Sequence, residues 1–280
     1  MPSIFTAPNT NKICYMILPE GIREDLDVGL KELSEKYSVS IVVISGANWN
    51  DDLTPWPAEG VFKKAKPFGG RAATFLDKLT NEIIPETEAG LGMVDAERTI
   101  LGVSLSGLFA VWSGFNTNVF TNIISISGSL WYDGFTEWMN EHTLSLQVKK
   151  VCMLLGEKEK NAKDKRMATV EERTHAAANI LKSKSQAAAT FELVEGTHFS
   201  PILPRLERAF EVDGTQVSQV MITNRIMGPQ RGQTEVTSRF NGWVGKNAPP
   251  RGATYDTDII LVCRVPTARR LLSFHGRSSR

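Results

Sequence analysis

Short apolar runs alternate with amphipathic stretches along residues 1–212 of the chain. The runs resemble strands that are buried on both faces of a parallel sheet. In the stretches between them, apolar side chains recur every three or four positions, which is the period of one helix face. This alternation predicts an α/β domain with a mostly parallel central sheet and helices on both faces. The predicted strands are residues 12–18, 39–45, 98–101, 122–128, 149–155 and 190–194, and the predicted helices are residues 26–37, 71–88, 105–115, 169–182 and 202–210.

A turn of small residues, 102–107, joins the predicted strand 98–101 to a helix. A serine at the centre of such a turn has strained backbone angles, and the residues two positions before and after it must be small. Gly102 fills the first of these positions, and Ser106 followed by glycine fills the second. The pattern predicts Ser104 as a nucleophile. A plain strand-to-helix turn with a chance serine remains the alternative.

Two stretches of backbone are candidates for an oxyanion hole. The N–H of Leu105 would stand at a helix start, where a donor without an intrahelical partner can bind a developing oxyanion. The loop that ends the first predicted strand supplies a second candidate donor at Glu20 or Gly21. Ligands of parallel α/β sheets bind outside the carboxyl ends of the strands, where both stretches are expected.

One histidine lies where a general base is needed. A serine hydroxyl is a weak nucleophile, and an imidazole must accept its proton. His198 follows the last predicted strand and precedes the closing helix, so it is the candidate base. His142 and His175 fall in polar, helix-like segments, and His275 falls in a basic tail.

The imidazole of such a pair needs an acceptor that fixes its tautomer. Glu159 stands three residues after Gly156, at the end of the strand 149–155, and is the candidate acid. Glu157 is an alternative, and either side chain could be one of the charges of a solvated turn. The order serine, acid, histidine is that of α/β hydrolases.

Residues 46–70 form a long loop with several aromatic side chains. Long loops in compact domains are usually functional. Trp49 and Trp56 of this loop, with Trp131 after the strand 122–128, are candidates for a pocket that binds the acyl or alcohol group of a substrate. A packed surface flap is the alternative.

Four motifs in this order resemble the esterase branch of the α/β hydrolases, which includes siderophore esterases and S-formylglutathione hydrolases. They are Gly-Val-Ser-Leu-Ser-Gly, Ser-Gly-Ser-Leu-Trp-Tyr, Leu-Gly-Glu-Lys-Glu-Lys and Gly-Thr-His-Phe. The resemblance covers residues 10–212 and implies an α/β-hydrolase fold without its first strands, with Ser104 as nucleophile and His198 as base. It leaves the acid open, because some members of this branch work without one.

The charge of the chain bears on whether it binds nucleic acid or a membrane surface. The net charge of +1 indicates no global field for nucleic acid or a membrane surface. Residues 213–280 nevertheless carry 10 Lys and Arg against 4 Asp and Glu, which leaves 22 against 27 in residues 1–212. We interpret 213–280 as a poorly ordered basic extension, and a tail for nucleic acid is the weaker alternative. We expect its deletion to leave esterase activity intact.

No signal peptide, membrane span, metal-binding motif or nucleotide-binding glycine loop is evident in the sequence. We therefore expect a cytoplasmic protein without cofactor or metal, and three reduced cysteines, Cys14, Cys152 and Cys263. The sequence as a whole predicts a serine esterase that acts on a small-molecule ester. An acyltransferase and a non-catalytic binding domain on the same scaffold are the alternatives.

Overall fold

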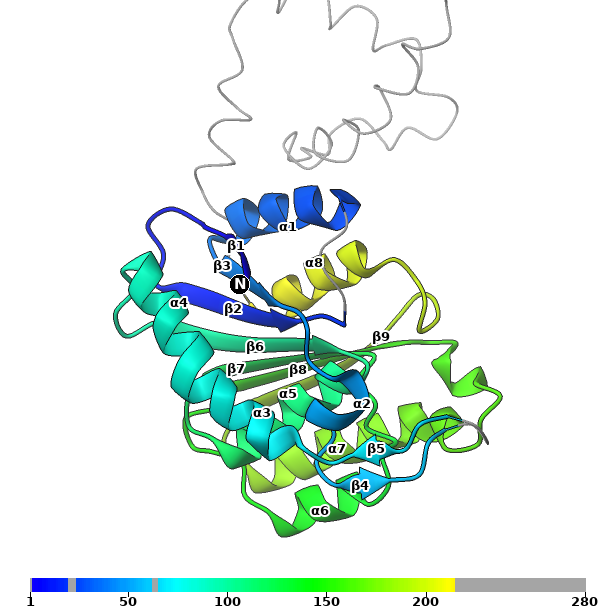
Figure 1. Ribbon diagram of the computed structural model, residues 1–280. Helices are drawn as coiled ribbons and strands as arrows, with labels where there is room; N and C mark the ends of the chain where they lie inside the picture. The colour runs from blue at the N-terminus through cyan, green and yellow to red at the C-terminus, as the bar shows by residue number, and fades with distance from the viewer. Residues whose placement is uncertain (1, 20–23, 62–64, 215–280) are drawn as a thin grey trace, which may run out of the picture. The chain divides into compact units, whose positions relative to one another are not determined.

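A computed structural model describes residues 2–19, 24–61 and 65–214. Within them, seven strands form one sheet in the order β1-β3-β2-β6-β7-β8-β9 (Figure 1). All neighbouring strands are parallel except β1, which pairs antiparallel with β3. The strands are β1 (Ser3–Phe5), β2 (Lys12–Ile17), β3 (Ser40–Ile44), β6 (Glu97–Val103), β7 (Asn122–Ile126), β8 (Lys150–Gly156) and β9 (Ala188–Val194).

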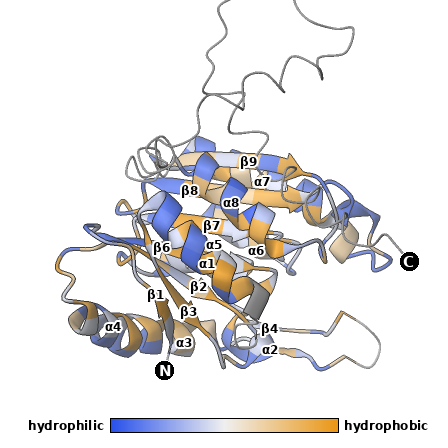
Figure 2. Ribbon diagram, turned by 90° about the horizontal axis from the view of Figure 1, so that it is seen from above, coloured by the Kyte–Doolittle hydropathy of each residue, from blue (hydrophilic) through white to orange (hydrophobic). Residues whose placement is uncertain are grey.

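Helices cover both faces of this sheet, as the alternating sequence pattern predicts (Figure 1). On one face, α1 (Glu24–Tyr37) and α8 (Ile202–Val212) pack on a core that includes Met16, Leu101 and Ile124. Figure 2 shows both hydrophobic and hydrophilic residues along α8, as expected of a helix with one face on the core. The other face carries the larger core and is covered by α3 (Ala72–Lys78), α4 (Ile84–Leu91), α5 (Leu105–Asn116), α6 (Phe135–Glu141) and α7 (Val170–Lys184). The mostly parallel sheet with helices on both faces confirms the predicted fold class, an α/β-hydrolase fold.

The structure differs from the sequence prediction in several local elements. Strand β1 lies before the first predicted strand, and residues 46–70 are not a plain loop. They contain a turn of helix, α2 (Trp49–Asp52), and a small hairpin of β4 (Pro57–Ala58) and β5 (Phe68–Gly69). These elements are too short to leave a periodic pattern in the sequence.

Two predicted helices also differ in detail. A π-helical turn, Leu79–Ile83, joins α3 to α4, so the predicted helix 71–88 is interrupted. Helix α7 begins without a side-chain cap, because the Thr169 hydroxyl donates to the carbonyl of Arg166 instead. Short 3-10 turns at Glu159–Asn161 and Met167–Thr169 precede α7.

Helix α8 ends at Val212, where the sequence predicts the end of the first domain. Residues 215–280 of the predicted basic extension lie outside the described residues, as does Cys263. Cys14 and Cys152 are buried and form no disulfide. In the part of the chain that the structure describes, no helix has the length and apolar character needed to cross a bilayer.

Candidate active site

Ser104 stands between β6 and α5 in a backbone conformation that few residues adopt. Its φ is 61° and its ψ is −123°, which is a strained conformation for a residue with a Cβ. Gly102 makes this turn possible, because a Cβ at that position would lie 2.0 Å from the carbonyl oxygen of Ser106. A Cβ on Gly107 would approach the Cα of Gly128 to 2.9 Å. The turn therefore has the close strand-to-helix approach expected of a nucleophile elbow.

The structure brings Ser104 and His198 together from the carboxyl ends of β6 and β9. Nε2 of His198 lies 3.1 Å from Oγ of Ser104, which is within hydrogen-bond distance. On its other side, Nδ1 of His198 lies 2.8 Å from Oε2 of Glu159. A base within reach of a nucleophile, and itself oriented by a carboxylate, is the geometry of a catalytic triad.

Glu159 is held by hydrogen bonds on both carboxylate oxygens. Its Oε1 accepts from the Ser127 hydroxyl at 2.5 Å and from the Gly156 N–H at 2.8 Å. Burial alone would raise the pKa of Glu159, but the hydrogen bonds from His198, Ser127 and Gly156 outweigh it and hold the pKa below its ordinary value. The carboxyl group is therefore suited to remain ionised beside the imidazole.

Glu157, the alternative acid, does not take this place. Its side chain is 49% exposed and lies 3.6 Å from the ammonium of Lys158, while the Glu159 side chain is only 3% exposed. The 3-10 turn that follows β8 directs Glu159 inward. Gly156 leaves the room for this, since a Cβ there would lie 2.9 Å from Oε1 of Glu159.

Two residues that the sequence analysis does not single out complete the surroundings of the acid. Ser127 follows β7, and its hydroxyl accepts a hydrogen bond from the buried guanidinium of Arg205 in α8 at 2.7 Å. Ser127 lies in one of the motifs of the esterase resemblance, but the motif does not say what its hydroxyl contacts. Arg205 lies in an amphipathic helix, where a charged residue is expected to be exposed, so the sequence carries no signal for it.

The second serine of the elbow has a different environment. Ser106 is fully buried, and its hydroxyl oxygen accepts from the Val103 N–H at 2.7 Å. The same oxygen lies 2.9 Å from the carbonyl oxygen of Ile17, the last residue of β2. Ser106 therefore links the ends of β2 and β6.

Of the predicted oxyanion donors, Leu105 lies among the described residues. Leu105 is the first residue of α5, and its N–H donates no hydrogen bond within residues 2–19, 24–61 and 65–214. This N–H directly follows Ser104, which is the position of an oxyanion donor in a nucleophile elbow. Glu20 and Gly21, which would supply the second donor, lie outside the described residues.

The three predicted pocket tryptophans have different surroundings. Trp131 is buried and lines a cavity of about 320 Å³, and the guanidinium carbon of Arg166 lies 5.5 Å from the centre of its ring. Trp49 and Trp56 do not line this cavity. Trp49 begins α2, and Trp56 donates from its indole N–H to the carbonyl of Asp133 at 3.0 Å. The cavity is lined by Trp131, Tyr132, Asp133, Gly134, Glu137, Lys165, Arg166, Thr169 and Arg173.

Trp56 and its neighbours attach the segment 46–70 to the domain. The Tyr132 hydroxyl donates to the Trp56 carbonyl at 2.5 Å, and the Trp56 ring packs against Trp138 at a centroid distance of 5.9 Å. The segment is therefore packed on the domain, and none of residues 46–70 is among the described residues that line the cavity of Trp131.

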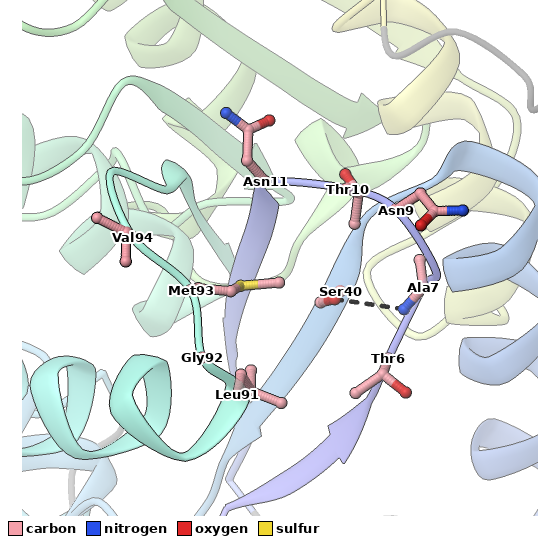
Figure 3. Close-up of a pocket in the computed structure, with 10 residues that line it drawn as sticks. All are labelled: Thr6, Ala7, Asn9, Thr10, Asn11, Ser40, Leu91, Gly92, Met93 and Val94. Atoms are coloured by element: carbon pink, nitrogen blue, oxygen red, sulfur yellow. Dashed lines mark hydrogen bonds between the residues drawn. The ribbon is translucent and has the colours of Figure 1, made fainter.

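A larger hollow, of about 430 Å³, lies away from the candidate triad (Figure 3). It involves the residues just before β2 and β6 and the first residue of β3, so it is at the amino ends of the parallel strands. The carboxyl ends, where Ser104 and His198 lie, are at the opposite edge of the sheet. Its lining residues are Thr6, Ala7, Asn9, Thr10, Asn11, Ser40, Leu91, Gly92, Met93 and Val94.

The two other described histidines, His142 and His175, make no hydrogen bond or ring contact with Ser104, His198 or Glu159 within the part of the chain that the structure describes. His142 stacks on Trp138 and its Nδ1 lies 2.7 Å from the carbonyl oxygen of that residue, while His175 packs edge-on against Phe191. His275 falls outside the described part of the chain. Among the residues described, no three His, Cys, Asp or Glu side chains gather into a possible metal site.

Two solved structures are similar to this chain in fold. A crystal structure described as an IroE-like serine hydrolase from Shewanella oneidensis has a TM-score of 0.59 and 21% identity, and the match covers 72% of this chain and 70% of that chain. The siderophore hydrolase EstB from Aspergillus nidulans has a TM-score of 0.56 and 18% identity, over 73% of this chain and 83% of that chain. At these identities the two structures support the fold.

Sequence comparison identifies the family. The uncharacterized protein YbbA of Bacillus subtilis is 29% identical over 147 residues, which cover 51% of this chain and 59% of that relative. The match therefore spans about three-fifths of the relative's length. The model of the family described as "Putative esterase" matches residues 27–199, and the chain belongs to this family.

Proposed function

We propose that this protein is a serine carboxylic-ester hydrolase that forms an acyl-enzyme on Ser104. The observation that carries the proposal is the continuous contact from Ser104 through His198 to Glu159, with distances of 3.1 and 2.8 Å. Membership of the esterase family supports the same chemistry. The serine's backbone strain, which a plain turn would not need, supports the role of Ser104.

In the first half of the reaction, Oγ of Ser104 attacks the ester carbonyl carbon and its proton moves to Nε2 of His198. The Leu105 N–H and a second donor, proposed at Glu20 or Gly21, bind the oxyanion of the tetrahedral intermediate. Removing one such donor typically costs ~2.7–4 kcal/mol of transition-state stabilisation. The carbon–oxygen bond to the alcohol then breaks, and His198 returns its proton to the leaving oxygen.

In the second half, water attacks the acyl carbon and gives a proton to His198. The bond to Oγ of Ser104 breaks, the carboxylic acid leaves, and the proton returns from His198 to the serine. Throughout, Glu159 accepts the hydrogen bond from Nδ1 of His198 and stabilises the imidazolium. Its low pKa favours the ionised carboxylate that this role requires. We propose that the cavity beside Trp131 receives part of a small-molecule ester.

The test compares Ser104→Ala with Ser113→Ala, a buried serine of the same helix whose hydroxyl donates to the carbonyl of Ala110. We expect Ser104→Ala to lower kcat for p-nitrophenyl acetate on the order of a million-fold, because nucleophile and base act as a unit. Ser113→Ala should keep the wild-type rate. A fluorophosphonate probe should label Ser104 in the wild type and leave Ser104→Ala unlabelled.

Three outcomes would contradict the proposal in different ways. If Ser104→Ala keeps most of the rate, or the probe labels another residue, the nucleophile is wrong. If the wild type neither hydrolyses a panel of esters of varied acyl length nor takes up the probe, the domain is a non-catalytic binding module. Acyl transfer to an added alcohol that outruns hydrolysis would identify an acyltransferase on the same site.

A further inference from the structure

Arg205 is a buried cation whose charge needs an explanation. Its side chain in α8 is only 6% exposed, and arginine is rarely buried without a partner. Within the described residues it forms no ion pair with a carboxylate. Its shortest contacts are instead Nη1 to the Ser127 hydroxyl and Nη2 to the carbonyl of Ser200, both at 2.7 Å.

The contact with Ser127 gives the hydroxyl of that serine a direction. A guanidinium can only donate, so the Ser127 oxygen accepts from Arg205 and its single proton is available to another acceptor. That acceptor is Oε1 of Glu159, 2.5 Å away. A directed chain of hydrogen bonds therefore runs from Arg205 through Ser127 to the carboxylate that orients His198.

The conformation of Ser127 agrees with a role for its hydroxyl. Its φ is 50°, in the left-handed region where glycine is favoured, and it is 1% exposed. The backbone N–H of Ser127 is held by the carbonyl of Leu154 at 2.7 Å. Glycine would suit this backbone better, but glycine would leave both Arg205 and Glu159 without the hydroxyl between them.

The other edge of the same guanidinium holds the loop that carries the base. Nη2 of Arg205 reaches the carbonyl of Ser200 at 2.7 Å and lies 3.5 Å from that of His198, and Nε lies 3.4 Å from that of Pro201. One rigid, planar group therefore contacts both the loop of the base and, through Ser127, the acid.

We propose that Arg205 is a positioning residue of the active site, acting through Ser127 to fix Glu159 and directly on the loop of His198. The inference rests on the proposed function and goes beyond it, because it adds a fourth and a fifth member behind the triad. The charges of Arg205 and Glu159 are consistent with this role, because each acts on the other across Ser127. Burial lowers the pKa of Arg205, and the negative charge of Glu159 acts in the opposite direction.

The experiment measures kcat, KM and the pH profile of kcat/KM in Arg205→Met, Arg205→Lys and Ser127→Ala. Arg208→Gln is the matched control. Arg208 is an arginine of the same helix, but its side chain is 45% exposed and pairs with Glu192. We expect Arg205→Met to lower kcat roughly 10- to 100-fold, because small misplacements of catalytic groups cost this much. KM should stay within about two-fold.

The pH profile distinguishes electrostatic positioning from a purely structural role. Glu159 is faced by His198 from the loop after β9 and, across the Ser127 hydroxyl, by Arg205 from α8. Without the cation, the pair of Glu159 and His198 takes up a proton more easily. The pH below which kcat/KM falls should therefore rise by roughly 0.5–1 unit in Arg205→Met. Arg205→Lys should return it toward the wild type. Ser127→Ala keeps the cation but removes the hydroxyl that donates to Glu159, so it should also raise this pH.

If Arg205→Met does not fold, Ser127→Ala still tests the inference. That substitution removes the hydroxyl between Arg205 and Glu159 but keeps the contacts of Arg205 with the loop carbonyls. Unchanged kcat and pH profile in Ser127→Ala, or a loss of rate without a shift of the acid limb, would overturn the inference. Failure of the proposed function has a different signature. It would appear with Arg205 and Ser127 unchanged, as a wild type that neither hydrolyses esters nor takes up the probe, or as a Ser104→Ala variant that keeps both properties.

Discussion

The hydroxyl oxygen of Ser106 lies 2.9 Å from the carbonyl oxygen of Ile17 and joins the nucleophile turn to the end of β2. The same oxygen accepts from the N–H of Val103, the last residue of β6. Ser106 is therefore a cross-link between two neighbouring strands, at the point where β2 leads toward the predicted oxyanion loop. This contact explains why a serine can occupy the position two residues after Ser104, where only a small residue fits.

Ser106→Ala should destabilise the protein more than it changes the chemistry. The substitution leaves the partly buried N–H of Val103 and the buried carbonyl of Ile17 without this partner, which costs about 1–3 kcal/mol. A loss of about 2 kcal/mol corresponds to a Tm lower by roughly 4–8 °C for a domain of this size. Differential scanning calorimetry measures it. Ser113→Ala, which removes only a contact within α5, should shift Tm far less, and equal shifts would contradict the cross-link.

Gly102→Ala should disrupt the nucleophile turn itself. The added Cβ would lie 2.0 Å from the carbonyl oxygen of Ser106, so strand and helix must separate. Overpacking of this kind typically costs 1–3 kcal/mol or more. Labelling of Ser104 by a fluorophosphonate probe should be lost with it. Gly90→Ala is the control, because a Cβ on Gly90 in α4 meets nothing within 4 Å and should be neutral or slightly stabilising.

Glu159→Gln should separate the two candidate acids. An amide can replace the shape of the carboxylate but not its charge, and the equivalent change in a serine protease triad lowers kcat about 10⁴-fold. A loss of that order, with KM nearly unchanged, is expected for Glu159→Gln in steady-state hydrolysis. Glu157→Gln, on the same turn but exposed and paired with Lys158, should keep the wild-type rate. Equal effects of the two substitutions would remove Glu159 from the triad.

The alternating pattern of the sequence predicted most of the sheet, because strands buried on both faces read as continuous apolar runs. It missed β1, a strand of three residues at the sheet edge whose side chains are largely exposed. It also missed the hairpin of β4 and β5, whose two-residue strands are too short for any periodicity. Short edge elements depend on tertiary contacts, and those are not encoded in local pattern.

The candidate site was predictable to the extent that it follows strand ends. Ser104 comes directly after β6 and His198 lies in the loop that follows β9. The rule that sites lie at carboxyl ends brings them together although 94 positions separate them. The choice between Glu157 and Glu159 needed the 3-10 turn, which turns the second side chain inward. Arg205 could not be predicted, because its burial depends on how α8 packs over the end of β7.

The low pKa of Glu159 has a consequence for stability in acid. Burial opposes ionisation, but the hydrogen bonds from His198, Ser127 and Gly156 prevail, so the pKa in the folded protein lies below the ordinary value of 4.5. A carboxyl group of this kind stabilises the fold at pH values above its unfolded pKa. This stabilisation is lost as the pH falls through the lower, folded pKa. The free energy of unfolding should therefore decrease below pH 4.5 more steeply in the wild type than in Glu159→Gln.

Urea unfolding from pH 6 to pH 3 measures this slope. Glu137 and Glu192 also have lowered pKa values, because they accept hydrogen bonds from Arg173 and Arg208, but these contributions are common to both proteins and cancel in the difference. Glu157→Gln is the control on the same turn and should keep the wild-type slope. The difference between wild type and Glu159→Gln should also persist in 0.5 M salt, since a nearly buried carboxylate is screened less than an exposed one. Identical slopes in wild type and Glu159→Gln would show that the hydrogen bonds around Glu159 do not favour its ionised form.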